Sequence, residues 1–337
     1  MSITSDVFRR AAGLVESWRR PLLLTHARPD GDAVGCLVAM QAMLRARGAD
    51  PHALLFGPVS DRCSFLWKDD PLTMTVDAAG AAARADEFAP DGVVILDTCS
   101  RVQLEPIAEW LGRSSLPKIA VDHHVTRDLP ADEYLIDESA AAAALVVLEW
   151  ATAARWPVDR RVAEALFVGL ATDTGWFRYS NTDPRALQAA AHLATCGASA
   201  SALHEAIYNR ESPARVRLEA AALGTLELHA DGRLAVMTLE PRHFAQSGAT
   251  PADTEDIVNG PMRIEGVWAS ALLVAHEPGL VRVSLRSRPP SDSVPDINVA
   301  TVASTLGGGG HARAAGARVQ GSLDSVKQQV IDRLRQA

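Results

Sequence analysis

Eight acidic or imidazole side chains between residues 26 and 173 follow short apolar runs, where they could do chemistry together. They are His26, Asp30, Asp32, Asp97, Asp122, His123, His124 and Asp173. The densest group is the triplet Asp122-His123-His124, directly after the apolar residues 119–121. In an α/β fold, side chains at the carboxyl ends of buried strands face a ligand-binding cleft. Carboxylates and imidazoles bind hard or borderline divalent cations, so this pattern predicts a metal centre.

Alternating strands and helices are predicted to position these groups. Apolar runs at 21–25, 93–96 and 119–121 indicate buried strands. The segment 33–47 has apolar residues at helical spacing and ends before Gly48, and 159–171 is a helical pattern that leads to Asp173. Further helices are expected within 1–20 and at 140–154 and 183–197, with a further strand at 53–56. Strands that alternate with helices indicate a parallel sheet covered on both faces.

The second half of the chain changes character after a polar, helix-prone connector at 198–218. Asp231-Gly232 between apolar runs is a strong hairpin signal, and a second hairpin is expected at 267–286. A helix at 297–306, a glycine-rich loop at 307–311, a strand at 317–319 and a helix from Ser322 follow. We therefore predict an N-terminal α/β domain at 1–197 and a smaller α+β domain at 219–337.

Composition limits the classes of partner. The chain has 337 residues, enough for two domains, and it is 47% hydrophobic and 22% charged, as in ordinary globular proteins. Its formal net charge of −8 argues against duplex DNA, because duplex binding needs a broad basic surface. Short nucleotides stay open, since two divalent ions would neutralise four of the acids. Four separated cysteines favour a reducing cytoplasm, and no apolar stretch suggests a signal peptide or membrane span.

Each candidate residue also has an ordinary structural explanation. His26 could be a buried core histidine, and Asp30 and Asp32 could be turn acids. Asp122 could cap a helix, and Asp173 could simply end one. Their coincidence at three strand ends and one helix end favours a shared function.

The number of carboxylates predicts how many ions are bound. Four of the carboxylates, those of Asp30, Asp32, Asp97 and Asp173, are more than one ion needs. We therefore expect two divalent ions, Mn²⁺ by preference and Mg²⁺ as the alternative. Asp97, alone at the end of its strand, is the simplest bridging ligand. Two ions that share one carboxylate would activate a water for in-line attack on phosphorus.

Four motifs, in order, resemble those of the DHH phosphoesterases, a family named for the triplet at 122–124. They are residues 25–35 (THARPDGDAVG), 96–97 (LD), 121–124 (VDHH) and 171–175 (ATDTG). Residues 307–316 (GGGGHARAAG) resemble the glycine-rich signature of the DHH-associated C-terminal domain. The resemblance covers nearly the whole chain. It implies an α/β DHH domain, a smaller substrate-binding domain and an active site in the cleft between them.

The resemblance also implies a role for each candidate residue. One metal would be held by His26, Asp30 and Asp97. A second metal would be held by Asp32, Asp97, His123 and Asp173. His124 would face the scissile phosphate, and Asp122 would orient the histidine pair. Substrate contacts would come from Arg286, Gly309, Gly310, His311 and Arg313.

Within the family, residues 172–180 (TDTGWFRYS) and the two-domain length look most like the nano-RNases, or oligoribonucleases. Many of these also act as 3'-phosphoadenosine 5'-phosphate phosphatases. We therefore expect a metal-dependent hydrolase that cleaves very short RNA to mononucleotides and 3'-phosphoadenosine 5'-phosphate to AMP, with a homodimer as one compatible assembly. Arg178 and Tyr179 could pair with a phosphate and stack on a base, or lie on an exposed loop.

Several alternatives stay open. A cyclic-dinucleotide or linear-dinucleotide phosphodiesterase shares the same core. A single-strand DNA exonuclease of the family is usually longer, and a family inorganic pyrophosphatase has a different C-terminal domain. A non-catalytic nucleotide sensor is the alternative from another class, and it is disfavoured because every metal ligand that the resemblance implies is present.

Overall fold

The chain divides into two units, Met1–Arg210 (unit 1) and Glu211–Ala337 (unit 2). The computed structural model describes residues 3–57, 59, 61–70, 73–77 and 79–337. The predicted connector at 198–218 contains helix α8 (Ala200–Tyr208) and the first half of helix α9 (Pro213–Gly224), and the division falls between these helices. No helix in the described ranges is long and apolar enough to cross a membrane.

Unit 1 contains a parallel sheet, as the sequence predicts, with six strands where the sequence indicates four. Its strand order is β3-β2-β1-β4-β5-β6, and every neighbouring pair is parallel. The strands are β1 (Pro21–Thr25), β2 (His52–Phe56), β3 (Thr73–Val76), β4 (Gly92–Leu96), β5 (Lys118–Asp122) and β6 (Glu133–Ile136). The strand order reverses between β1 and β4, which is where α/β sheets bind ligands.

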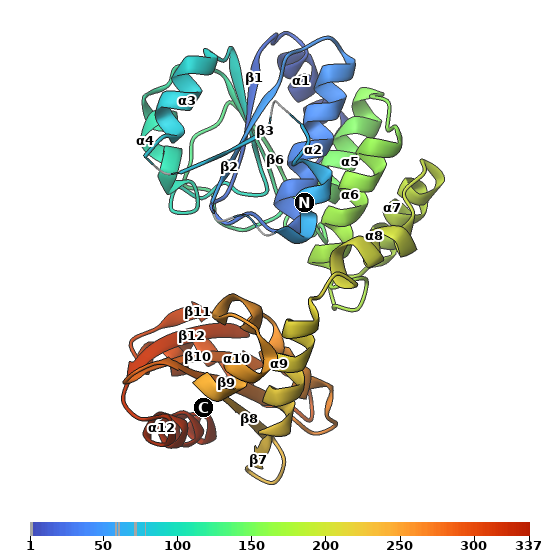
Figure 1. Cartoon of the computed structure of the whole chain (residues 1–337). Helices are drawn as coiled ribbons and strands as arrows, with labels where there is room; N and C mark the ends of the chain where they lie inside the picture. The colour runs from blue at the N-terminus through green and yellow to red at the C-terminus, as the bar shows by residue number, and fades with distance from the viewer. Residues whose placement is uncertain (1–2, 58, 60, 71–72, 78) are drawn as a thin grey trace. The chain divides into compact units, whose positions relative to one another are not determined.

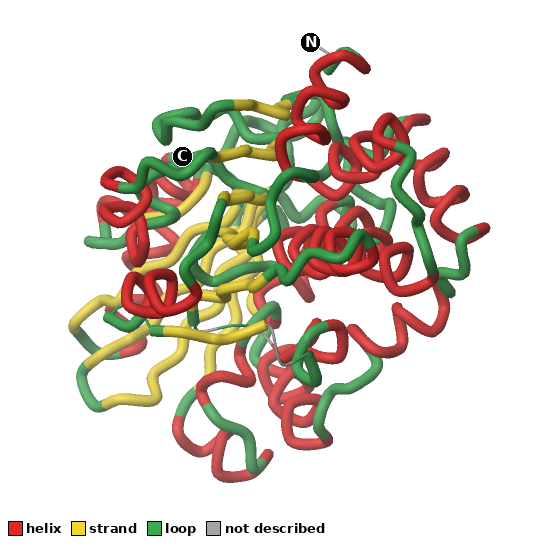
Figure 2. Tube along the Cα trace, turned by 90° about the horizontal axis from the view of Figure 1, so that it is seen from above, coloured by secondary structure: helices red, strands yellow, loops and turns green. Residues whose placement is uncertain are grey.

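Helices cover both faces of this sheet (Figures 1 and 2). One face packs against α1 (Ser5–Val15), α2 (Gly31–Ala46), α5 (Ala143–Ala154) and α6 (Arg160–Asp173). The other face packs against α3 (Ala81–Phe88) and α4 (Glu105–Arg113). A short 3-10 helix, η1 (Asp61–Leu66), and helix α7 (Pro184–Thr195) complete the unit with α8. Asp183 caps α7 as its position before Pro184 indicates, because its side chain accepts a hydrogen bond from the Ala186 N–H.

Two glycines let helices α2 and α6 pack closely. A Cβ atom at Gly35 would lie 2.4 Å from the carbonyl oxygen of Ala165, and one at Gly169 would lie 2.7 Å from Asp32 Oδ1. Only a residue without a side chain fits at such separations. The contact brings the start of α2, which carries Asp32, beside the end of α6 at Asp173.

Unit 2 contains a mixed sheet with the order β11-β12-β10-β9-β8-β7. The strands are β7 (Glu227–His229), β8 (Leu234–Leu239), β9 (Ala269–Glu277), β10 (Leu280–Ser287), β11 (Gly309–His311) and β12 (Ala314–Gln320). Both predicted hairpins, β7–β8 and β9–β10, are antiparallel as expected. Strands β8 and β9 are parallel, and their connection contains α10 (Pro241–Ser247), η2 (Pro251–Thr254) and η3 (Ile257–Arg263).

The two faces of this second sheet have separate cores. One face packs against α11 (Val299–Thr305) and α12 (Leu323–Gln336), and the other packs against α9, α10 and η3. The predicted loop at 307–311 is wrong in part, because Gly309–His311 forms the edge strand β11. A Cβ atom at Gly308 would lie 2.1 Å from the Gly316 carbonyl oxygen, so the glycines allow close approach to β12.

Candidate active site

Three neighbouring strands end at one level and carry the predicted site residues there. Thr25 at the end of β1 pairs with Leu96 of β4, and Leu96 pairs with Val121 of β5. His26 and Asp97 directly follow the first two of these strands, and Asp122 is the last residue of the third. The register therefore brings together groups that are up to 96 residues apart in the chain.

Asp97 lies at the centre of the group. Its Oδ2 is 3.4 Å from His26 Nε2, and its Oδ1 is 3.7 Å from His123 Nε2. The side chain is almost completely buried, and the backbone is left-handed with φ of 60°. Aspartate tolerates this conformation better than most residues, but it still carries strain. The turn directs Oδ2 of Asp97 toward His26 and Oδ1 toward His123.

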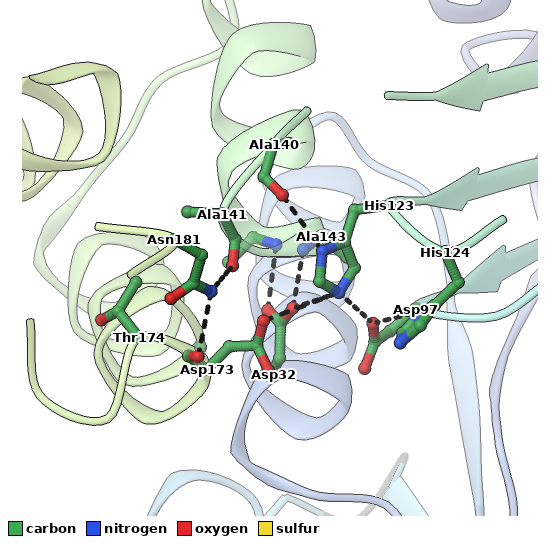
Figure 3. Close-up of polar contacts among 12 residues, drawn as sticks. Asp32, Asp97, His123, His124, Ala140, Ala141, Ala143, Asp173, Thr174 and Asn181 are labelled. Carbon is green, nitrogen blue, oxygen red and sulfur yellow. Dashed lines mark hydrogen bonds and ion pairs between the residues drawn. The ribbon is translucent and has the colours of Figure 1, made fainter. Parts of the chain in front are cut away.

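The ligand atoms form the two predicted sets and a third group, Asp97, His123 and His124, which links them through Asp97 and His123. His26, Asp30 and Asp97 form one set whose atoms lie within 4.8 Å of one another, and Asp32, His123 and Asp173 form another. His123 Nε2 is 4.0 Å from Asp32 Oδ2 and 3.6 Å from Asp173 Oδ2. The side chain of His123 lies between Asp32 and Asp97 (Figure 3). These groups come from strand ends and from helices α2 and α6, as the sequence predicts.

Backbone carbonyls fix the orientation of two histidine rings. His26 Nδ1 lies 3.0 Å from the carbonyl oxygen of Ala27, and His123 Nδ1 lies 3.2 Å from that of Ala140. A carbonyl oxygen can only accept, so each Nδ1 must carry the proton. Each Nε2 faces the carboxylates and has a lone pair for a metal when the ring is neutral. This is the tautomer in which histidine binds metals through Nε2.

Asp122 has a narrower role than expected. Its Oδ1 accepts hydrogen bonds from the backbone N–H groups of His123 and His124 and from His124 Nδ1, at 2.7 Å for the ring. It therefore orients the ring of His124, whereas the ring of His123 is held by Ala140. The hydrogen bond to Asp122 raises the pKa of the half-exposed His124, although burial acts in the opposite direction.

The electrostatics of the site favour bound cations. Burial, and then repulsion from neighbouring carboxylates, raises the pKa of Asp32 and of Asp97 well above the usual range. Burial also raises the pKa of Asp173, and His123 offsets part of this effect. Asp97 Oδ1 and Asp122 Oδ2 are buried and accept no hydrogen bond from any residue that the structure describes. A buried carboxylate without a hydrogen-bond partner costs folding free energy. Divalent cations would remove this cost, and carboxylate oxygens with imidazole nitrogens are suitable ligands for them.

Two of the acids also cap helices. Asp30 is the N-cap of α2 and accepts hydrogen bonds from the N–H groups of Asp32 and Ala33. Asp32 accepts hydrogen bonds from the first two N–H groups of α5, those of Ala143 and Ala144, at 2.6 and 2.9 Å. The residue before α5 is an alanine, which has no capping group of its own, so Asp32 replaces a local N-cap.

The segment 140–144 is a part of the site that the sequence does not reveal. It contacts His123 through a carbonyl oxygen and Asp32 through two N–H groups. These contacts use backbone atoms of an alanine run, which has no chemical signature in the sequence. Alanines in this region predict only a helix.

The turn after Asp173 has an unusual backbone. Gly175, Trp176 and Phe177 are left-handed in succession, with φ between 56° and 61°. The hydroxyl of Thr174 stabilises this turn because it accepts a hydrogen bond from the Phe177 N–H. Tyr179 is largely exposed, so its predicted stacking on a base stays a prediction.

In unit 2, Arg286 lies on β10, Gly309, Gly310 and His311 form β11, and Arg313 lies between β11 and β12. Ala314 pairs with Arg286 on one side and with His311 on the other. Directly opposed residues share a face of a sheet, so the side chains of Arg286 and His311 lie on the same face, about 10 Å apart at their backbones. Gly309 and Gly310 lie on the exposed strand β11. Arg313 donates hydrogen bonds to the Asp296 carboxylate and the Ile297 carbonyl, which leaves fewer donors for a ligand.

Residues 22–170 match the DHH family, N-terminal domain, and residues 231–337 match the DHHA1 domain. The chain belongs to the DHH family. The two matched ranges fall in unit 1 and unit 2. They include every predicted site residue of this DHH protein except Asp173, which lies three residues beyond the first range. The family predicted from the motifs is confirmed.

Two relatives that match most of this DHH protein share one name. Bifunctional oligoribonuclease and PAP phosphatase NrnA of Thermus thermophilus is 29% identical over 98% of this chain and 94% of its own length. The protein of the same name from Bacillus subtilis is 24% identical over 88% of each chain. Among solved structures, an exopolyphosphatase-related protein from Bacteroides fragilis has a TM-score of 0.88 at 20% identity, over 99% of this chain and 97% of that one. This last likeness establishes a shared fold.

Proposed function

We propose that this DHH protein is a metal-dependent phosphoesterase. It hydrolyses very short oligoribonucleotides to mononucleotides, and 3'-phosphoadenosine 5'-phosphate to AMP. The observation that carries the proposal is the position of Asp97, which offers one carboxylate oxygen to each of two His/Asp sets. The name shared by relatives that match nearly the full chain supports this class of substrate.

The two ligand sets would hold two divalent cations. His26 and Asp30 would bind one, and Asp32, His123 and Asp173 the other, with Asp97 shared between them. Mn²⁺ is preferred to Mg²⁺ because each set contains an imidazole nitrogen, whereas Mg²⁺ takes mainly oxygen ligands. Divalent ions held there lower the pKa of water and offset negative charge on a phosphate under in-line attack.

His124 is the group that would donate a proton to the reacting phosphate or its leaving group. Its Nδ1 proton is donated to Asp122, which also favours the imidazolium form with a second proton at Nε2. The half-exposed ring can donate that second proton to a phosphate oxygen or to the departing ribose oxygen. Asp122 keeps the ring in one orientation, because two backbone N–H groups fix its carboxylate.

Unit 2 would bind the terminal nucleotide. Arg286 and His311 lie on one face of its sheet, and a guanidinium suits recognition of a phosphate by two parallel hydrogen bonds. The exposed glycines 309 and 310 would let backbone N–H groups approach the same anion. Arg313 would support this site from its pair with Asp296. Such a site holds one end of a strand, so extra nucleotides would add little binding.

The compartment and assembly are part of the proposal. The cysteines of the chain are free thiols, and three of the four are buried, which is compatible with the predicted cytoplasm. The predicted homodimer is to be measured by light scattering.

The activity can be tested with the purified full chain after removal of metals with EDTA. The substrates are a labelled RNA dinucleotide, a long single-stranded RNA, 3'-phosphoadenosine 5'-phosphate and cyclic di-AMP. We expect mononucleotides from the dinucleotide and AMP from 3'-phosphoadenosine 5'-phosphate, each only after Mn²⁺ or Mg²⁺ is restored. Faster turnover of cyclic di-AMP would instead favour a cyclic-dinucleotide phosphodiesterase, and nucleotide binding without turnover would favour a sensor.

A further inference from the structure

Asn181 connects the two parts of the site that hold one ligand set. Its Nδ2 donates a hydrogen bond to the carbonyl oxygen of Ala141 at 3.0 Å and another to that of Asp173 at 3.2 Å (Figure 3). Both acceptors are carbonyls, so the amide nitrogen must face them. The side chain therefore joins the segment 140–144 to the last residue of helix α6.

The segment 140–144 contacts the other two ligands of the same set. The Ala140 carbonyl accepts from the ring of His123, and the N–H groups of Ala143 and Ala144 donate to Asp32. Asp32, His123 and Asp173 are thus all fixed to one short piece of backbone, the third through Asn181. Among the described residues, no hydrogen bond joins the side chains of His26, Asp30 or Asp97 to the segment 140–144.

The segment has a second anchor that does not involve Asn181. At its start, Asp137 accepts hydrogen bonds from the N–H and hydroxyl of Ser139 and from Arg185, which also pairs with Glu149 of α5. Helix α5 is further buried in the core of unit 1. Loss of the Asn181 amide should therefore leave the fold intact while it releases Asp173 from the segment.

We propose that Asn181 is a positioning residue for the ligand set Asp32, His123 and Asp173. It sets the separation of Asp173 from the other two ligands, and so the affinity of this set for its divalent cation. The set that contains His26 is independent of Asn181. The proposal rests on the proposed function, because it requires that the two sets bind cations.

The test is a Mn²⁺ titration of the EDTA-treated full chain by calorimetry. The samples are the wild type, Asn181→Ala, Asn181→Asp and the control Asn259→Ala. Asn259 donates to Asp256 on the surface of unit 2, so its change removes an asparagine bond far from the ligands in sequence. The wild type and the control are expected to bind two ions. Asn181→Ala should bind one of them about 10- to 100-fold more weakly and the other unchanged, as for other partners of metal ligands.

Asn181→Asp should have at least the same effect, since a carboxylate cannot donate to two carbonyls. With the dinucleotide substrate, activity of Asn181→Ala should recover as Mn²⁺ is raised, with an unchanged KM. Three results would overturn the inference: wild-type Mn²⁺ binding by both variants, equal weakening of both ions with a lower Tm of the metal-free protein, or a raised KM at saturating Mn²⁺. Failure of the wild type to bind ions would instead overturn the proposed function.

Discussion

Replacement of Asp97 by asparagine should stabilise the metal-free protein and abolish its activity. Asparagine keeps the shape of the side chain and tolerates the left-handed backbone at this position, which alanine would not. The change removes one negative charge from the middle of a buried group of carboxylates. It also removes the one side chain that both proposed cation sites share.

The gain in stability follows from the distances. Asp97 Oδ1 and Asp32 Oδ2 are 3.7 Å and 4.0 Å from the same nitrogen, His123 Nε2, so the two oxygens are at most about 7.7 Å apart. At an effective dielectric constant of about 20, two unit charges at that separation repel by about 2 kcal/mol. A gain of this size corresponds to an increase in Tm of about 4 to 8 °C for a unit of about 200 residues.

The assay is thermal unfolding of EDTA-treated wild type and Asp97→Asn at neutral pH, with and without Mn²⁺, beside dinucleotide hydrolysis. Mn²⁺ should raise the Tm of the wild type and have little effect on that of the variant. Hydrolysis by the variant should be at least 1,000-fold slower, which corresponds to a loss of about 4 kcal/mol of transition-state stabilisation. An unchanged or lower Tm of the metal-free variant would refute the argument from repulsion. Retained hydrolysis would refute the shared ligand.

Three further predictions test other parts of the structure. Because burial and repulsion raise the pKa of Asp32 and Asp97, the stability they contribute without metal is present below the unfolded pKa of about 4 and is lost as pH rises through the raised values. The Tm difference between Mn²⁺-loaded and EDTA-treated protein should therefore widen from about pH 5 to about pH 8, and parallel curves would contradict this. Gly35→Ala should cost about 1 to 3 kcal/mol in urea unfolding, because α2 and α6 must separate, whereas Gly13→Ala at an exposed position of α1 should stabilise by about 0.5 to 1 kcal/mol. Arg286→Ala should raise KM for the dinucleotide with little change in kcat, and a loss in kcat at constant KM would count against a binding role.

The parallel sheet and the ligand sets could be predicted because their signals are local. A buried parallel strand is a continuous apolar run, and a charged residue directly after such a run is easily recognised in the sequence. Asp97 and Asp122 both satisfy this rule, and the register of β1, β4 and β5 then brings them together without further information. The position of Asp173 at the end of an apolar helix predicts its role in the same way.

Other elements could not be predicted because their signals are weak or lie in the backbone. The four-residue strands β3 and β6 lie at the edges of the sheet, where a short half-exposed run does not differ from a loop. The glycine run at 307–310 indicates a flexible loop by composition, yet Gly308 and Gly310 are needed for a close approach to β12. The carbonyl that orients His123 belongs to Ala140, a residue whose type says nothing about this role.

At Asp30 and Asp32, the capping of a helix and the proposed binding of a metal do not exclude each other. A helix N-terminus carries a partial positive charge, and a carboxylate placed there is stabilised by roughly 0.3 to 1 kcal/mol, or up to about 2 when partly buried. Asp32 uses the free N–H groups of α5 in this way, so the fold itself offsets part of the cost of burying its charge. The offset is incomplete, because the pKa of Asp32 is still raised. A bound cation can offset the rest of the cost of burying this charge. Helices α2 and α5 therefore hold Asp30 and Asp32 in place before any ion binds, so these two carboxylates both cap a helix and belong to a ligand set.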